Sequence, residues 1–179
     1  MKKYLLIAVM AIASVAFATA QPRAIGGRLG AFDGVSYQHG FGDSNMLEVE
    51  AGWGWGGCVS HFHDGQHDWH WGGHSVQAAV TYDWIDPFGA TFPTMPKGEW
   101  HWYLGVGGAG GFNFHGHENN FGFVGAAGRC GVEYDFWFPL QLAVDFRPTL
   151  GAAFWNGGAG FYWDMWSAAF GLCVRYKFN

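Results

Sequence analysis

The segment LQLAVDFRPTL at positions 140–150 decides the fold, because its side chains alternate in polarity with period two. Every second residue from Leu140 onward is apolar, whereas the residues between them include Asp145 and Arg147. An α-helix would scatter those charges around its circumference, but a β-strand places them all on one face. The segment therefore predicts a strand with one apolar face and one ionised face.

The same alternation recurs in the segments that begin at Leu47, Val76, Trp100, Val124 and Phe170. The polar faces of these segments carry small residues and charges of both signs. The charged residues expected to turn inward are Arg28, Glu48, Glu50, Asp83, Arg129, Glu133, Asp135, Asp145, Arg147, Arg175 and Lys177. Opposite charges in a confined interior are expected to pair, because an unpaired charge there is costly.

Turn signals divide the chain into eight expected strands, at 24–31, 35–39, 46–56, 75–85, 99–112, 120–135, 139–150 and 160–178. The dipeptide Asp33-Gly34 places a tight hairpin turn at 32–34. The inner connections are then 40–45, 86–98 and 136–138, and the outer loops are 32–34, 57–74, 113–119 and 151–159. The pattern predicts an all-β fold, an eight-stranded antiparallel up-and-down transmembrane β-barrel.

A soluble β-sandwich with its apolar faces inward would show the same alternation. Three features favour the membrane barrel: balanced charges on the polar faces, small residues beside them, and aromatic residues at the strand ends. Those aromatic residues are Trp53 and Trp55 at one rim and Trp84, Trp100, Trp102, Tyr134 and Tyr176 at the other. Eight strands enclose a space that side chains fill, so we expect a closed, charge-paired lumen.

Residues 1–20 have the pattern of a secretory signal peptide. Lys2 and Lys3 precede an apolar run, and the small residues at 18–20, Ala-Thr-Ala, match a cleavage site. We expect the barrel domain to span 21–179. No other uncharged apolar run reaches the length of a membrane-spanning helix, and the 30 glycines disfavour helices.

Charge and cysteine content limit the classes of partner. Removing Lys2 and Lys3 from nine basic residues leaves seven against fourteen acidic ones, a net charge of −7 that gives no case for nucleic acid. Strand parity places Cys130 and Cys173 on opposite faces of the wall, so we expect these thiols, together with Cys58, to be free.

The chain resembles the small, OmpX-like, eight-stranded outer-membrane β-barrel family. The matching segments are Ser36-Tyr37-Gln38-His39, Trp102-Tyr103-Leu104-Gly105-Val106-Gly107-Gly108, Gly131-Val132-Glu133-Tyr134, Pro139-Leu140-Gln141-Leu142, Asp145-Phe146-Arg147-Pro148 and Val174-Arg175-Tyr176-Lys177-Phe178. The resemblance covers essentially the whole mature chain, and these motifs include no catalytic residue. The resemblance implies a monomer in the outer membrane of a Gram-negative bacterium, surrounded by outer-membrane lipid and lipopolysaccharide.

The last strand resembles the signal that the outer-membrane assembly machinery reads. Val174, Tyr176 and Phe178 supply its alternating apolar residues and its terminal aromatic residue. The chain departs from this pattern because Asn179 follows Phe178.

The expected outer loop 57–74 is rich in histidine, and imidazole is a natural ligand of zinc, copper and nickel. His61, His63, His67 and His70 are the candidate ligands, with His61 and His63 spaced to chelate on an extended chain. The alternative is a solvated surface loop, because the spacing follows no known metal motif. We expect no cofactor apart from this possible divalent metal.

Other functions compete with a structural or surface-interaction role. Ser60 beside His61, and Ser75 beside His74, are the candidate pairs for lipid-modifying chemistry. Neither pair has an identifiable third, orienting group, so we expect no enzyme. A small pore and an adhesion surface formed by outer-loop tryptophans are the remaining alternatives.

Overall fold

The computed structural model describes residues 21–30, 32–63, 66–89, 91–93, 95–114, 120–165 and 169–178; the side chains at 21–22, 55–63, 66–73 and 89 are outside this description. The expected signal peptide, 1–20, also lies outside the described residues. Within them the elements are β1 (Gln21–Gly30), β2 (Phe32–Gly40), β3 (Asn45–His63), β4 (Gln66–Ile85), the 3-10 turn η1 (Pro87–Gly89), β5 (Gly98–Phe114), β6 (Phe121–Phe136), β7 (Leu140–Phe146), β8 (Thr149–Trp155), β9 (Gly158–Asp164) and β10 (Phe170–Lys177).

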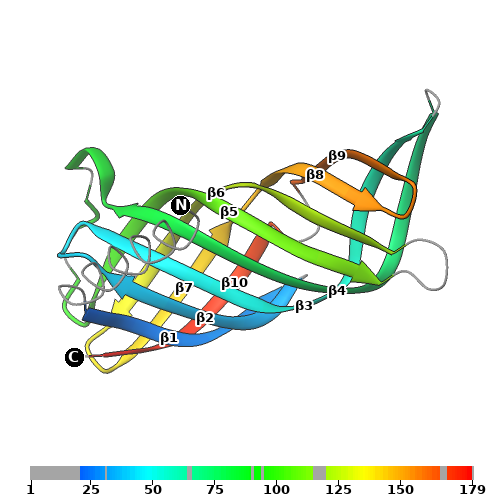
Figure 1. Ribbon diagram of the computed structural model, residues 1–179. Coiled ribbons are helices and arrows are strands. Elements are labelled where there is room, and N and C mark those ends of the chain that lie inside the picture. Colours follow the sequence, from blue (N-terminus) through cyan, green and yellow to red (C-terminus); the bar gives the residue numbers. More distant parts are fainter. Residues whose placement is uncertain are drawn as a thin grey trace, which may run out of the picture.

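Eight of these strands form a closed antiparallel barrel (Figure 1). Around the ring the order is β1, β2, β3, β4, β5, β6, β7 and β10. The ring closes where β1 pairs with β10, from Ala24 opposite Lys177 to Gly30 opposite Gly171. The all-β, eight-stranded antiparallel barrel predicted from the sequence is therefore confirmed. The sandwich alternative is wrong, because a sandwich needs two separate sheets and the β1–β10 pairing closes these strands into a single sheet.

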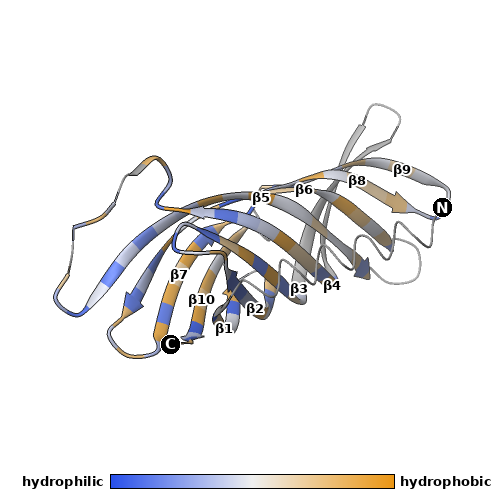
Figure 2. Cartoon of the chain, turned by 60° about the vertical axis from the view of Figure 1, so that its left-hand side comes forward, coloured by the Kyte–Doolittle hydropathy of each residue, from blue (hydrophilic) through white to orange (hydrophobic). Residues whose placement is uncertain are grey.

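Side chains alternate between the barrel interior and its outer face. In β10, Leu172 and Val174 are exposed, whereas Cys173 and Arg175 are buried. Figure 2 shows the resulting bands of polar and apolar residues along strands such as β7 and β10. Cys130 is exposed on the outside and Cys173 is buried inside, and both are free thiols, as strand parity predicted.

A break at Pro148 corrects the expected seventh and eighth strands. Proline lacks the N–H that a strand ladder requires. The expected strand 139–150 is therefore two strands, both of which pair with β6: β7 opposite Cys130–Asp135 and β8 opposite Phe121–Ala127. The expected loop 151–159 is instead the β8–β9 hairpin, which turns at Asn156 and Gly157. The expected strand 160–178 is likewise two strands, because β9 pairs with β8 whereas β10 pairs with β7.

The β3–β4 hairpin corrects the expected outer loop 57–74. Its register is unbroken from Asn45 opposite Trp84 to His63 opposite Gln66, so strand pairing continues through most of the residues expected to form a loop. In Figure 1 this extension projects beyond the ring at the same end as β8 and β9. The outer end is therefore built of strands that outlast the eight-stranded ring.

The first hairpin also turns earlier than expected. Phe32, Asp33 and Gly34 belong to β2, and Arg28 pairs opposite Gly34. The Asp33 carboxylate accepts a hydrogen bond from the Gly30 N–H at 3.0 Å, which caps the end of β1 instead of forming the centre of the turn. At the third outer loop, β5 continues to Phe114, and 115–119 lie outside the described residues.

The barrel interior changes character toward its outer end. Ala79, Ala109 and Ala127 form a buried layer of small side chains. A buried aromatic cluster contains Phe121, Phe123, Ala153 and Tyr162, in which the rings of Phe123 and Tyr162 stack at 4.1 Å. An apolar cluster thus lies on the β6–β8–β9 wall, whereas most of the buried charged residues lie in the eight-stranded ring.

Gly105 of β5 faces the interior where a larger residue has no room. A Cβ atom at this position would lie 1.7 Å from Asp83 Oδ1. We expect Gly105→Ala to displace the Asp83 carboxylate and to lower the free energy of unfolding by about 1–3 kcal/mol, the usual cost of overpacking. Urea titration of the protein refolded in detergent micelles measures this change.

Gly108→Ala on the same strand is the matched control. Its Cβ would lie 3.6 Å from the nearest atom, the carbonyl oxygen of Gly125, which is an ordinary contact. We expect a change within about 0.5 kcal/mol. Equal effects of the two alanines would contradict the packing described for the interior.

Candidate functional site

The candidate site is a network of ionised side chains inside the barrel. Strand alternation turns Glu48 and Glu50 of β3 inward, together with Arg129 and Glu133 of β6. The other buried charged residues of the predicted set are Arg28, Asp83, Asp145, Arg147 and Arg175. Asp135 lies at the inner mouth and is only partly buried. The structure therefore places nine of the eleven charged residues predicted to turn inward in the buried interior. The other two, Asp135 and Lys177, form a partly exposed pair at the mouth.

Arg129 is the centre of the network. Its Nη1 donates to Asp83 Oδ2 at 2.8 Å and also to Glu48, and its Nη2 donates to Asp145 Oδ2 at 2.8 Å. Nη2 also lies 3.2 Å from the Tyr103 hydroxyl oxygen, and the guanidinium carbon sits 4.6 Å from the centre of the Tyr103 ring. One planar cation thus contacts three carboxylates and an aromatic ring, a geometry that the forked guanidinium permits.

Glu48 is the carboxylate that most donors share. It accepts hydrogen bonds from Ser36 Oγ at 2.6 Å and from Gln38 Nε2 at 2.9 Å, in addition to Arg129. Arg175 Nη2 donates to Glu48 Oε1 at 2.5 Å, whereas Arg129 donates to Oε2. Arg175 in turn donates from Nε to Ser36 Oγ at 2.7 Å, so a neutral hydroxyl helps to hold this second cation on Glu48.

On the outer side of this centre, Arg28 and Arg147 flank Glu50. The Nε atom of each arginine lies 3.2 Å from a Glu50 oxygen. Arg28 Nη2 also donates to Asp145 Oδ1 at 2.9 Å, which connects this layer to Arg129. The guanidinium groups of Arg28 and Arg147 lie 5.8 and 5.6 Å from the ring centre of Phe32, which is fully buried. Phe32 therefore packs against the two cations on the outer side of the network.

The inner side is joined by a residue that the sequence reasoning missed. Arg23 pairs with Glu133, and its Nη1 donates to Gln38 Oε1 at 3.1 Å. A register shift between Pro22 and Ala24 interrupts the alternation there, so parity gave no signal for this arginine. At the mouth, Lys177 lies 3.5 Å from Asp135.

The neutral members Ser36, Gln38, Tyr103 and Gln141 were also missed, because charge alone does not point to them. Strand parity does contain the signal. Ser36 pairs directly opposite Glu50 and Gln38 opposite Glu48, and directly opposite residues of a strand pair share a face. Polar residues on the face of a known charge are therefore the candidates to satisfy it.

Formal charges in this network balance. Among the described residues it contains five arginines, Arg23, Arg28, Arg129, Arg147 and Arg175, and five carboxylates, Glu48, Glu50, Asp83, Glu133 and Asp145. Ligand atoms of Glu48, Glu50, Asp145 and Cys173 lie within 4.8 Å of one another, close enough to hold a cation. The arginines already supply the positive charge that these carboxylates need, so this donor set does not require a metal.

Other candidate residues fall into two groups. The side chains of His61, His63, His67 and His70, and those of Cys58 and Ser60, lie outside the described residues, so metal binding there stays a prediction. Ser75 is buried in the interior whereas the adjacent His74 is exposed. Consecutive strand residues face opposite sides of the wall, so this arrangement does not favour the pair as a catalytic dyad.

The expected assembly residues lie on the outer face. Val174 and Tyr176 of β10 are exposed, and Phe178 follows the strand directly. Tyr176 and Phe178 contact each other with their ring centres 5.5 Å apart. These three residues thus form one apolar strip along the last strand.

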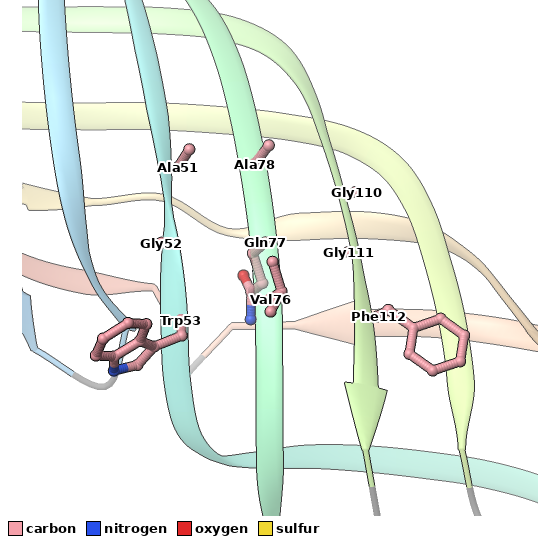
Figure 3. Close-up of a pocket in the computed structure, with 9 residues that line it drawn as sticks. All are labelled: Ala51, Gly52, Trp53, Val76, Gln77, Ala78, Gly110, Gly111 and Phe112. Atoms are coloured by element: carbon pink, nitrogen blue, oxygen red, sulfur yellow. The ribbon is translucent and has the colours of Figure 1, made fainter.

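A shallow groove also crosses the outer face of β3, β4 and β5 (Figure 3). Trp53 and Phe112 lie on either side of Val76 in one paired row. The neighbouring row consists of the small residues Ala51, Ala78 and Gly110. The groove has an apolar lining and presents no ionisable group, so it offers a surface for hydrocarbon and no catalytic chemistry.

Comparison with known proteins gives no relative: no family model, no curated protein and no solved structure matches the chain significantly. Among the residues that the structure describes, no helix is long and apolar enough to cross a membrane. A function for this chain must therefore be inferred from the chemistry of the barrel itself.

Replacing Arg129 tests whether the network stabilises the barrel. Arg129→Met leaves Glu48, Asp83 and Asp145 without their shared cation. Because a buried charge that loses its partner is strongly destabilising, we expect the free energy of unfolding to fall by about 3–5 kcal/mol. Urea titration in lipid vesicles, followed by tryptophan fluorescence, measures the change.

Lys177→Met is the control, because it removes a charge of the same sign from a partly exposed pair at the mouth. We expect a loss below about 1 kcal/mol. Losses of similar size in the two variants would show that the position inside the network has no special energetic role.

Proposed function

We propose that this protein is an integral outer-membrane β-barrel of a Gram-negative bacterium, with a structural or surface-interaction role and a closed, charge-paired lumen. The observation that carries the proposal is that the barrel wall is polar on its buried inner face and apolar on its exposed outer face. Each of the eight barrel strands contributes a side chain to the buried polar network: Arg28, Ser36, Glu48, Asp83, Tyr103, Arg129, Asp145 and Arg175.

The same eight strands direct large apolar side chains outward. One exposed example from each strand, in the order of the ring, is Leu29, Val35, Val49, Val80, Val106, Val124, Val144 and Leu172. Soluble monomers rarely expose a continuous apolar surface of this extent, and an apolar belt around a polar interior is the arrangement that a lipid bilayer stabilises. Contact of this apolar face with lipid acyl chains removes it from water, which supports a membrane location.

Aromatic residues at the two ends of the strands support the same location. Trp100 contacts Tyr134 with ring centres 4.8 Å apart at the inner end, and Phe112 contacts Phe114 at 4.9 Å toward the outer end. Amphipathic and aromatic side chains favour the boundary between water and hydrocarbon. The signal-peptide pattern in residues 1–20 supports export, and the strip of Val174, Tyr176 and Phe178 suits recognition by the assembly machinery.

A closed lumen follows from how the network fills the ring. Arg129 bridges carboxylates from β3, β4 and β7, so side chains meet at the centre of the barrel. Moving a hydrated ion past this centre requires breaking several buried pairs at once, and each costs several kcal/mol. The strand extensions at the outer end then provide the surface for contact with lipopolysaccharide or with other partners.

Planar-bilayer recording tests the closed lumen. We expect the refolded protein to produce no discrete conductance steps, because the paired charges block the path. The double variant Glu48→Ala/Arg129→Ala removes one oppositely charged pair from the centre and should raise the leak current. Stable unitary steps from the unmodified protein would contradict the scaffold role and favour the alternative of a small pore.

A further inference from the structure

One segment at the inner end of the barrel has properties that the ring does not explain. Residues 86–97, here called the inner arm, connect β4 to β5 and contain the turn η1. Figure 1 shows this segment, which follows β4, standing out from the barrel at the end where β1 begins and β10 ends. Its sequence, DPFGATFPTMPK, holds two charges in twelve residues, Asp86 and Lys97.

The base of the inner arm is fixed to β5. Asp86 donates its N–H to the Trp102 carbonyl oxygen at 2.8 Å, and its Oδ1 accepts a hydrogen bond from the Trp102 N–H at 3.1 Å. Its Oδ2 lies 2.6 Å from His101 Nδ1. The single carboxylate of the arm is thus occupied at the base, and the described remainder of the arm presents only the charge of Lys97.

Phe88 is held in a conformation that exposes it. Its backbone has φ 64° and ψ 15°, in the left-handed region that costs a non-glycine residue about 1 kcal/mol or more. The side chain is nevertheless 92% exposed. Within the described chain, the phenyl ring is therefore not buried in a way that would offset the energetic cost of this backbone conformation. Phe92 and Met95 are also substantially exposed.

The inner arm continues the aromatic belt of the outer face. The Phe92 ring lies 6.2 Å from that of Trp100, which points outward from β5. Trp100 contacts Tyr134, and Tyr134 contacts Phe136 with ring centres 4.6 Å apart. This contact directs the arm over the outer surface of the wall, so it reaches the zone where the apolar belt ends.

We propose that the inner arm is an interfacial anchor that rests on the inner leaflet of the membrane, with Phe88 inserted at the boundary between headgroups and acyl chains. The inference rests on the proposed membrane location. Exposed aromatic and apolar side chains without free carboxylates suit this boundary, and Lys97 suits the lipid phosphates. The anchor would stabilise the barrel at a defined depth on the β4–β5 side.

Spin-label accessibility in nanodiscs of phosphatidylcholine and phosphatidylglycerol tests the anchor. The probe site is Phe88→Cys in a chain whose three native cysteines are replaced by serine. Cys130, retained alone on the outer face, is the lipid reference, and Asp43→Cys, at an exposed position of the 41–44 connection, is the water reference. Collision rates with oxygen and with a water-soluble nickel chelate report the depth of each label.

We expect the ratio of oxygen to nickel collisions at Phe88→Cys to be several-fold higher than at Asp43→Cys, and lower than at Cys130. A ratio equal to that of Asp43→Cys, while Cys130 reads as lipid-exposed, would overturn the anchor and leave the membrane location standing; the arm would then be a surface for an aqueous partner. A nickel-accessible Cys130 would overturn the membrane location and the anchor with it.

Discussion

The rest of the structure depends on mutual neutralisation inside the ring. Each buried guanidinium or carboxylate loses most of its hydration, a cost of several kcal/mol that only close partners offset. Arg129 meets this constraint for Glu48, Asp83 and Asp145 together, and these residues come from three different strands. The charges can be satisfied only when those strands curve around a common centre, so the chemistry of the interior and the closure of the barrel require each other.

This constraint also explains the composition of the wall. Large ionised side chains leave little space beside them, so the neighbouring inward positions hold small residues, as Gly105 does against Asp83. The apolar residues must then occupy the other face, where neither a second sheet nor a described helix covers them. Inward glycines thus leave room for the charged side chains, arginines neutralise the buried carboxylates, and valines cover the outer face. The result is a polar interior with an apolar exterior. This arrangement supports the proposed role as a scaffold in a lipid bilayer.

Period-two alternation was sufficient to predict the face of each long strand, because side-chain direction in a strand depends on position alone. The choice of a barrel over a sandwich also needed the balanced charges and small residues of the polar faces and the aromatic residues at the strand ends. Strand parity failed where a local event breaks the alternation: the register shift beside Arg23 and the missing N–H of Pro148. It also misjudged strand ends, since histidine and glycine composition suggested a loop where β3 and β4 remain paired. The dipeptide Asp64-Gly65, typical of two-residue hairpin turns, was the sequence signal that β3 and β4 form one long hairpin. Hydrogen-bond partners such as Tyr103 needed three-dimensional distances, which parity does not provide.

The most direct test of the account is the solution behaviour of residues 21–179 after refolding with and without lipid. Analytical ultracentrifugation with circular dichroism measures the assembly state and the β-sheet content together. The account predicts a folded, monomeric barrel only in detergent or lipid, and aggregation when both are withdrawn, because the apolar belt then meets water. A stable, folded monomer in plain buffer would contradict it, since the outer face would then have no need of a hydrocarbon environment.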